Sequence, residues 1–211
     1  LHDLGWTGAG IDIAVIDTGV NAVAGLDGFN KVIHGPDLSF ESGTQFYAQD
    51  TYGHGTAMAS IIAGDDGDGY QGVAPGSRIL SLKVADNTGA VDVSQVIAAL
   101  DWVTQYGQGE GLNVRVINLA YVTPSTQPYE IDPLAAAVQR PGAAGDAVVV
   151  AILSGADNFD RLDAEVELHG AAIEVAGRVV LTLAAEGADD EVVLDSLDAA
   201  RVKARSVVAD V

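Results

Sequence analysis

The segment Gly5–Val20, with the sequence GWTGAGIDIAVIDTGV, decides the fold. Its centre, Ile11–Ile16, is a short and mainly apolar run, and the turn-forming residues Asp17–Gly19 close it. Short apolar runs bounded by turn signals are typical of strands that are buried on both faces of a parallel sheet. The sequence therefore predicts a buried strand that carries Asp17 at its carboxyl end.

Further strand and helix signals alternate along the first 150 or so residues. Strands are predicted at Lys31–His34, Arg78–Val84, Val114–Leu119 and Ala147–Leu153, and helices at Gly53–Gly64, at Asp92–Tyr106 and from Asp132-Pro133 through Arg140. Asp92 and Gln95 have the spacing of a capping box. Trp6 and Trp102 are expected in the core. Buried strands that alternate with helices predict an α/β fold, with a parallel sheet flanked by helices.

The sequence pattern changes after about Asp157. Three short strands separated by glycines are predicted at Ala164–Leu168, Ala171–Val175 and Val179–Leu183, followed by a helix at Asp189–Arg205. Short strands with such punctuation are typical of a meander. We therefore divide the chain into a core at 1–157 and a C-terminal segment at 158–211. That segment is either a divergent completion of the sheet or a small α+β appendage.

The composition excludes several classes of function. Lys and Arg number 10 against 30 Asp and Glu, for a net charge of −20, so a phosphate-binding face for nucleic acid is not expected. No run of 18 apolar residues occurs, which argues against a membrane span. The absence of Cys excludes disulfides and a thiol nucleophile. No leader pattern follows Leu1, so we expect that any signal segment was removed or was never part of this sequence.

Two residues stand out as a candidate catalytic pair. Asp17 ends the first predicted strand, and His54 begins a helix of small residues in the stretch Gly53-His54-Gly55-Thr56. Taken singly, such an Asp is usually a turn former and such a His is usually a packing residue. Together, their segments resemble the subtilases, the subtilisin-like serine proteases. The matching stretches are Gly5–Val20, His54–Gly64 (HGTAMASIIAG), Gly72–Val84 (GVAPGSRILSLKV) and Val116–Leu119 (VINL), in the order and spacing of that family.

The resemblance covers about residues 5–153 and implies a serine endopeptidase. It would make Asp17 the buried carboxylate of a catalytic triad and His54 the general base. A serine hydroxyl needs a neutral imidazole within hydrogen-bond reach, and the carboxylate fixes the tautomer of that imidazole. Gly53 and Gly55 would let the backbone approach the ring closely. We therefore expect a His54 ring nitrogen within ~3.2 Å of an Asp17 carboxylate oxygen.

The nucleophile of the triad is not found by its motif. The family serine lies in a Gly-Thr-Ser-Met-Ala-type segment, and this chain contains no Gly-Thr-Ser. By distance from His54 the best-placed serine is Ser206, which lacks a preceding glycine turn. Three explanations stay open. The chain is a fragment whose serine-bearing part is a separate chain, the C-terminal segment is a divergent or engineered replacement, or the protein is a pseudoprotease that binds peptides without cleaving them.

The resemblance also implies groups that would contact a substrate. Asn158 is the nearest candidate for the oxyanion-hole donor, although an Asn in an exposed turn is the alternative interpretation. Leu119, Ala120 and Tyr121 occupy the strand that would pair with the backbone of a substrate. Val122 stands where the family has glycine, which adds bulk at that position.

The acidic loop Gly64–Tyr70 lies where many subtilases hold a structural calcium. Carboxylates in a glycine-rich loop suit a hard cation, so Asp66 and Asp68 are candidate ligands, with a solvated turn as the alternative.

Partners and location follow from the resemblance and from exposed apolar surface. The substrate would be a peptide or protein, and the location secreted or extracellular. A chain without the late helices of a subtilase would leave apolar surface uncovered, so we also expect self-association or a partner chain.

Overall fold

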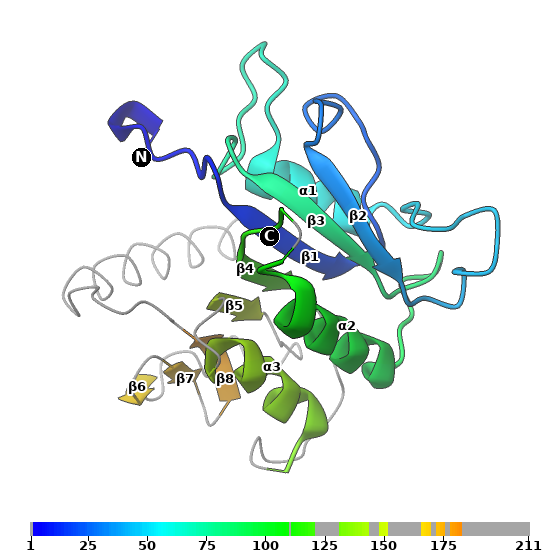
Figure 1. Cartoon of the computed structure of the whole chain (residues 1–211), viewed down its shortest axis with the longest axis vertical. Coiled ribbons are helices and arrows are strands. Elements are labelled where there is room, and N and C mark those ends of the chain that lie inside the picture. Colours follow the sequence, from blue (N-terminus) through cyan, green and yellow to red (C-terminus); the bar gives the residue numbers. More distant parts are fainter. Residues whose placement is uncertain are drawn as a thin grey trace, which may run out of the picture.

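The computed structural model describes residues 2–109, 111–120, 131–143, 148–151, 166–169, 172–175 and 178–182. These residues form one eight-stranded sheet flanked by helices (Figure 1). The strands are β1 (Asp12–Asp17), β2 (Val32–Asp37), β3 (Arg78–Lys83), β4 (Val114–Leu119), β5 (Val148–Ala151), β6 (Val166–His169), β7 (Ala172–Val175) and β8 (Arg178–Thr182). The helices are the 3-10 turn η1 (His2–Leu4), α1 (His54–Ala63), α2 (Val93–Tyr106) and α3 (Pro133–Ala143).

The sheet has the order β2-β3-β1-β4-β5-β8-β7-β6. Its first five strands are parallel, which confirms the predicted α/β fold. The last three strands are antiparallel to their neighbours, as expected of a meander. β8 pairs directly with β5, so the described strands beyond residue 157 continue the same sheet.

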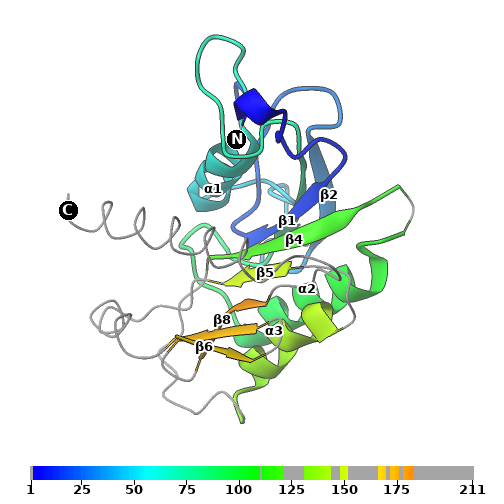
Figure 2. The ribbon, with the colours of Figure 1, turned by 90° about the vertical axis from the view of Figure 1, so that its left-hand side faces the viewer.

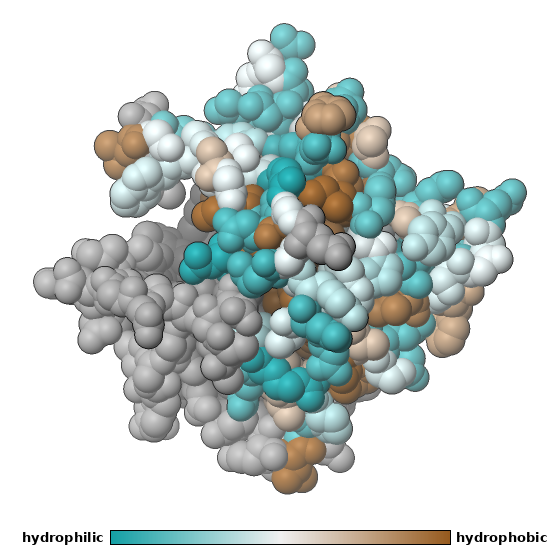
Figure 3. Space-filling model, in the orientation of Figure 1, coloured by the Kyte–Doolittle hydropathy of each residue, from teal (hydrophilic) through white to brown (hydrophobic). Residues whose placement is uncertain are grey.

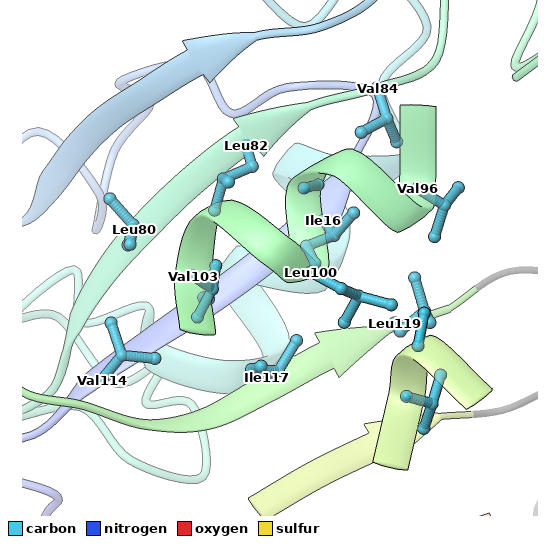
Figure 4. Close-up of a cluster of buried hydrophobic side chains, with 14 of the residues drawn as sticks. Ile16, Leu80, Leu82, Val84, Val96, Leu100, Val103, Val114, Ile117 and Leu119 are labelled. Atoms are coloured by element: carbon cyan, nitrogen blue, oxygen red, sulfur yellow. The ribbon is translucent and has the colours of Figure 1, made fainter. Parts of the chain in front are cut away.

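Alternate residues of β1 build two cores on the two faces of the sheet. Ala14 and Ile16 pack with α2 and α3, in the cluster that Figure 4 shows around Leu100. Ile13 and Val15 face the other way and pack against α1. Figure 2 shows α1 on one side of the strands and α2 with α3 on the other. A central strand covered on both faces must be apolar on both, which explains the sequence of β1.

The helix ends follow the capping signals in the sequence. The Asp92 carboxylate accepts the Ser94 N–H at 2.8 Å, and the Gln95 side chain accepts the Asp92 N–H at 2.7 Å. This is the predicted capping box, and it fixes the start of α2. The third helix runs past the expected end at Arg140 and includes Pro141.

Two expectations about the N-terminal half need correction. Trp6 is 66 % exposed, because it lies in the segment before β1, which extends away from the body of the sheet in Figure 1. Trp102, by contrast, packs at the edge of the core, with its ring centroid 5.2 Å from that of Tyr106.

β2 is longer than predicted, since it continues through Pro36. A proline is tolerated there because β2 is an edge strand of the sheet.

The surface of the described residues is mixed, and it includes exposed large hydrophobic side chains such as Phe29 and Phe40. On the face in Figure 3, hydrophobic side chains lie interspersed among hydrophilic ones. Within the described part of the chain, no helix combines the length and the apolar character needed to cross a membrane.

The packing of α2 gives a test of the fold. We expect Leu100→Ala to lower the free energy of unfolding by about 2–5 kcal/mol, because Leu100 is fully buried between α2 and the sheet. Gln105→Ala on the exposed face of the same helix should change it by less than about 0.5 kcal/mol. Urea denaturation measures both values. Equal effects of the two variants would contradict the described orientation of α2.

Candidate active site

Asp17 is the last residue of β1, at the carboxyl edge of the parallel strands. Its side chain is buried, and one carboxylate oxygen, Oδ1, accepts the Thr18 N–H at 2.7 Å. β1 pairs with β4 as far as Val15 and with β3 through Asp17 itself, which is paired with Lys83, so the end of β1 is held by β3. The carboxylate therefore has a fixed position in a place where parallel sheets commonly form sites.

His54 is the first residue of α1, and its ring lies against this carboxylate. His54 Nδ1 is 2.8 Å from Asp17 Oδ1 and 2.9 Å from Oδ2, which confirms the expected distance. An ionised carboxylate can only accept, so in the neutral imidazole Nδ1 carries the proton and Nε2 carries the lone pair. The His54 side chain is 40 % exposed, and Nε2 bonds to none of the residues that the structure describes. This arrangement suits a general base.

Two glycines allow α1 to start so close to β1. Gly53 has φ of +105°, a conformation that favours glycine. A Cβ on Gly55 would lie 2.1 Å from the Gly19 carbonyl oxygen and 3.1 Å from the Asp17 Cβ. The expected close approach is therefore present, and at Gly55 only a hydrogen atom fits.

Asp50 lies beside this pair and bonds to the segments that carry it, and sequence reasoning missed it. It is buried, and its Oδ1 accepts the Thr18 hydroxyl at 2.8 Å and the Gly53 N–H at 2.6 Å. Its Oδ2 accepts the N–H of Thr56 at 2.8 Å and the Thr56 hydroxyl at 2.5 Å. The only sequence signal for Asp50 was its place a few residues before a helix start, where an Asp is typical of a helix cap. Here the carboxylate also reaches back to the end of β1.

The pKa of Asp50 records this environment. Burial by itself would raise the pKa of the carboxyl, but the hydrogen bonds from Thr56, Gly53 and Thr18 outweigh burial and lower the pKa below its ordinary value. Asp50 is therefore a buried charge satisfied by donors rather than by a cation.

A buried lysine, Lys83, contacts the residues next to Asp17 at the end of β1. Lys83 is paired with Asp17 in the register of β3 and β1, and its Nζ donates to the Thr18 carbonyl at 2.7 Å. Nζ also lies 3.0 Å from Glu41 Oε2, which accepts the Thr51 hydroxyl at 2.8 Å. A buried ammonium needs such partners, and the bond to the Thr18 carbonyl also fixes the peptide between Thr18 and Gly19.

Of five further predicted site residues, the structure describes Leu119 and Ala120. The Leu119 side chain is fully buried in the core, and its backbone is paired with Ala151 of β5. Ala120 follows it and is partly buried. Tyr121, Asn158 and Ser206 lie outside the described residues. The proposed roles of these five residues stay predictions.

The acidic loop is organised by its own backbone. Asp66 Oδ1 accepts the N–H groups of Asp68 at 2.9 Å and Tyr70 at 3.0 Å. These hydrogen bonds lower the pKa of the exposed Asp66 carboxyl. Across the described ranges, no group of three or more His, Cys, Asp or Glu side chains is arranged to hold a metal ion. Calcium binding by Asp66 and Asp68 therefore stays a prediction, and no chemistry is assigned to it.

Comparisons with known proteins point to one family. The sequence model of the subtilase family matches residues 8–184. The chain is 34% identical to subtilisin DY of Bacillus licheniformis over 148 residues, which are 70% of this chain and 48% of that protein. It is 35% identical to a subtilisin-like protease of Coccidioides posadasii (strain C735) over 119 residues, 54% of this chain and 26% of that protein.

A solved structure supports the same relationship. The crystal structure of a cold adapted subtilisin-like serine proteinase matches with a TM-score of 0.53 and 29% identity, over 69% of this chain and 47% of that one. The chain thus spans less than half the length of these relatives.

The contact at Gly55 gives a test of the site. We expect Gly55→Ala to lower the free energy of unfolding by about 1–3 kcal/mol, because the new methyl group would push α1 away from β1. Gly43→Ala is the matched control, since a Cβ there would meet no heavy atom within 4 Å. Thermal or urea unfolding measures both. An unchanged stability for Gly55→Ala would contradict the described approach of the two segments.

The lowered pKa of Asp50 predicts a pH dependence. A carboxyl whose pKa is lower in the folded state stabilises the fold fully above its unfolded pKa, about 3.9, and loses this effect as pH falls through the folded pKa. The stability difference between wild type and Asp50→Asn should therefore be constant above about pH 5 and shrink below about pH 4. Urea denaturation across this range measures it, with the exposed Asp27→Asn as the baseline for removing one charge. A difference that grows on acidification would reverse the assigned sign.

Proposed function

The chain belongs to the subtilase family, and from this premise we propose that it supplies the acid–base half of a serine endopeptidase site. The observation that supports this most directly is the 2.8 Å hydrogen bond between His54 Nδ1 and Asp17 Oδ1. The proposed reaction is hydrolysis of peptide bonds by acyl transfer through a serine hydroxyl. Peptides or proteins are the proposed substrates, and a secreted or extracellular location is proposed from the same membership.

In this mechanism His54 moves the proton and Asp17 fixes the tautomer. Nε2 takes the proton of the serine hydroxyl as the hydroxyl attacks the carbonyl carbon, and it later gives the proton to the leaving amine. The Asp17 carboxylate stabilises the imidazolium that forms between these steps. The 40 % exposure of the His54 side chain supports access of a substrate to the ring.

The nucleophile is the open part of the proposal. The sequence contains no Gly-Thr-Ser segment, and the chain spans less than half the length of its relatives. We therefore propose that a serine-bearing segment beyond this sequence completes the site.

The second candidate is a non-catalytic module that binds peptides or assembles with another chain, which is either a second copy or a separate protein. The missing serine motif favours it. The two candidates differ in whether a serine reacts.

The test compares the chain itself with a chimera in which residues 158–211 are replaced by the serine-bearing C-terminal half of subtilisin DY. We expect a fluorophosphonate probe to label the chimera but not the chain. His54→Ala should reduce peptide hydrolysis by the chimera at least about 10³-fold, because the general base is lost.

The outcomes separate the candidates. A chimera that unfolds cooperatively but is neither labelled nor active contradicts the endopeptidase proposal, and saturable peptide binding by the chain would then support the binding module. Labelling of the chain itself that is lost in both His54→Ala and Ser206→Ala supports the endopeptidase and overturns the external nucleophile.

A further inference from the structure

Asp50 lies outside the Asp17–His54 pair but bonds to the segments that carry both residues. We propose that Asp50 is a positioning residue, whose carboxylate aligns the end of β1 with the start of α1 and so holds the His54 ring on Asp17. The inference rests on the proposed function only for the catalytic meaning of that pair. In the described part of the chain, none of the hydrogen bonds of Asp50 involves the imidazole itself.

The first set of contacts fixes the backbone on both sides of His54. Asp50 Oδ1 accepts the N–H groups of Tyr52 at 3.1 Å and Gly53 at 2.6 Å, just before the histidine. Oδ2 accepts the N–H of Thr56 at 2.8 Å, two residues after it. The N-cap position, Gly53, has no side chain to cap the helix, so Asp50 satisfies a free N–H of α1 from outside it. The peptide that carries His54 is thereby held from both directions.

The second contact joins this loop to β1 through a hydroxyl relay. The Thr18 hydroxyl donates to Asp50 Oδ1 at 2.8 Å and accepts the Gly55 N–H at 2.9 Å. Thr18 directly follows Asp17, and Gly55 directly follows His54. One hydroxyl therefore bridges the residues next to the two members of the pair, and Asp50 orients that hydroxyl.

The position of Asp50 is itself fixed. The Asn21 side chain accepts the Asp50 N–H at 3.0 Å and donates to the Asp50 carbonyl at 2.9 Å. This reciprocal pair holds the backbone of Asp50, and so it fixes the point from which the carboxylate reaches the loop.

The donors around Asp50 require a carboxylate rather than an amide. The hydroxyls of Thr18 and Thr56 each accept a peptide N–H, from Gly55 and Asn21, so each must give its single proton to Asp50. Together with three peptide N–H groups, five donors then point at the two oxygens of Asp50. In Asp50→Asn one of these oxygens becomes an NH₂ group, which can only donate, and donors would face donors. Donors left without an acceptor cost more free energy here than at the surface, because the site is buried and water cannot replace the lost hydrogen bonds.

The test measures the His54 Nδ1 proton by NMR in the chain itself, so it needs no serine. The proton that Nδ1 gives to Asp17 should exchange with water at least about tenfold faster in Asp50→Asn, because opening of the pair becomes easier. Thr18→Val, which removes the relay hydroxyl, should accelerate exchange in the same way. Thr18→Ser, which keeps a hydroxyl, should exchange as slowly as the wild type. Failure of the fluorophosphonate test would leave this measurement unaffected.

A matched control separates positioning from general stability. Asp12 lies at the other end of β1, is fully buried, and pairs with Arg78. Asp12→Asn should therefore destabilise the protein without accelerating exchange of the His54 proton. Unchanged exchange in Asp50→Asn and Thr18→Val would overturn the proposal, and so would equal acceleration in Asp12→Asn at the same loss of stability. If Asp50→Asn does not fold, Thr18→Val and Thr18→Ser decide alone.

Discussion

The hydrogen bond between His54 and Asp17 joins residues 37 positions apart, and the rest of the site is arranged around it. It can form only where the start of α1 lies almost in contact with the end of β1. Because a Cβ on Gly55 would overlap the Gly19 carbonyl, this approach depends on an absent side chain as much as on any contact. Burial of β1 between two other strands then keeps one partner of the bond fixed.

The site contains two buried carboxylates in a protein whose net charge is already −20. Asp17 and Asp50 are both buried, and each is satisfied mainly by N–H and O–H donors. Lys83 contributes the one described buried ammonium nearby, and it pairs with Glu41 rather than with either Asp. Donors satisfy a carboxylate without neutralising it, so Asp17 stays an acceptor for the His54 ring.

The Asp17–His54 pair lies in the parallel part of the described sheet. β1 to β5 have the parallel arrangement that carries Asp17 and His54, whereas β8, β7 and β6 add antiparallel strands beyond β5. The first part packs through two apolar cores, one on each face. The dyad depends on contacts among β1, β3, α1 and the loop before it, all within the first 83 residues. Its geometry thus depends on one part of the region, residues 8–184, that matches the family model.

The sequence by itself determined the features that are local. The apolar run of β1 and the capping box of α2 each act over a few residues, so pattern and spacing predicted these elements. The pairing of Asp17 with His54, 37 positions apart, was predicted only from the resemblance of their two segments to the subtilases. Four features could be seen only in the tertiary structure: the hydrogen bonds of Asp50, the ion pair of Lys83, the burial of Leu119 and the exposure of Trp6. These depend on which segments meet in space, because a hydrogen bond between residues 18 and 50 leaves no periodic or spaced signal in the chain.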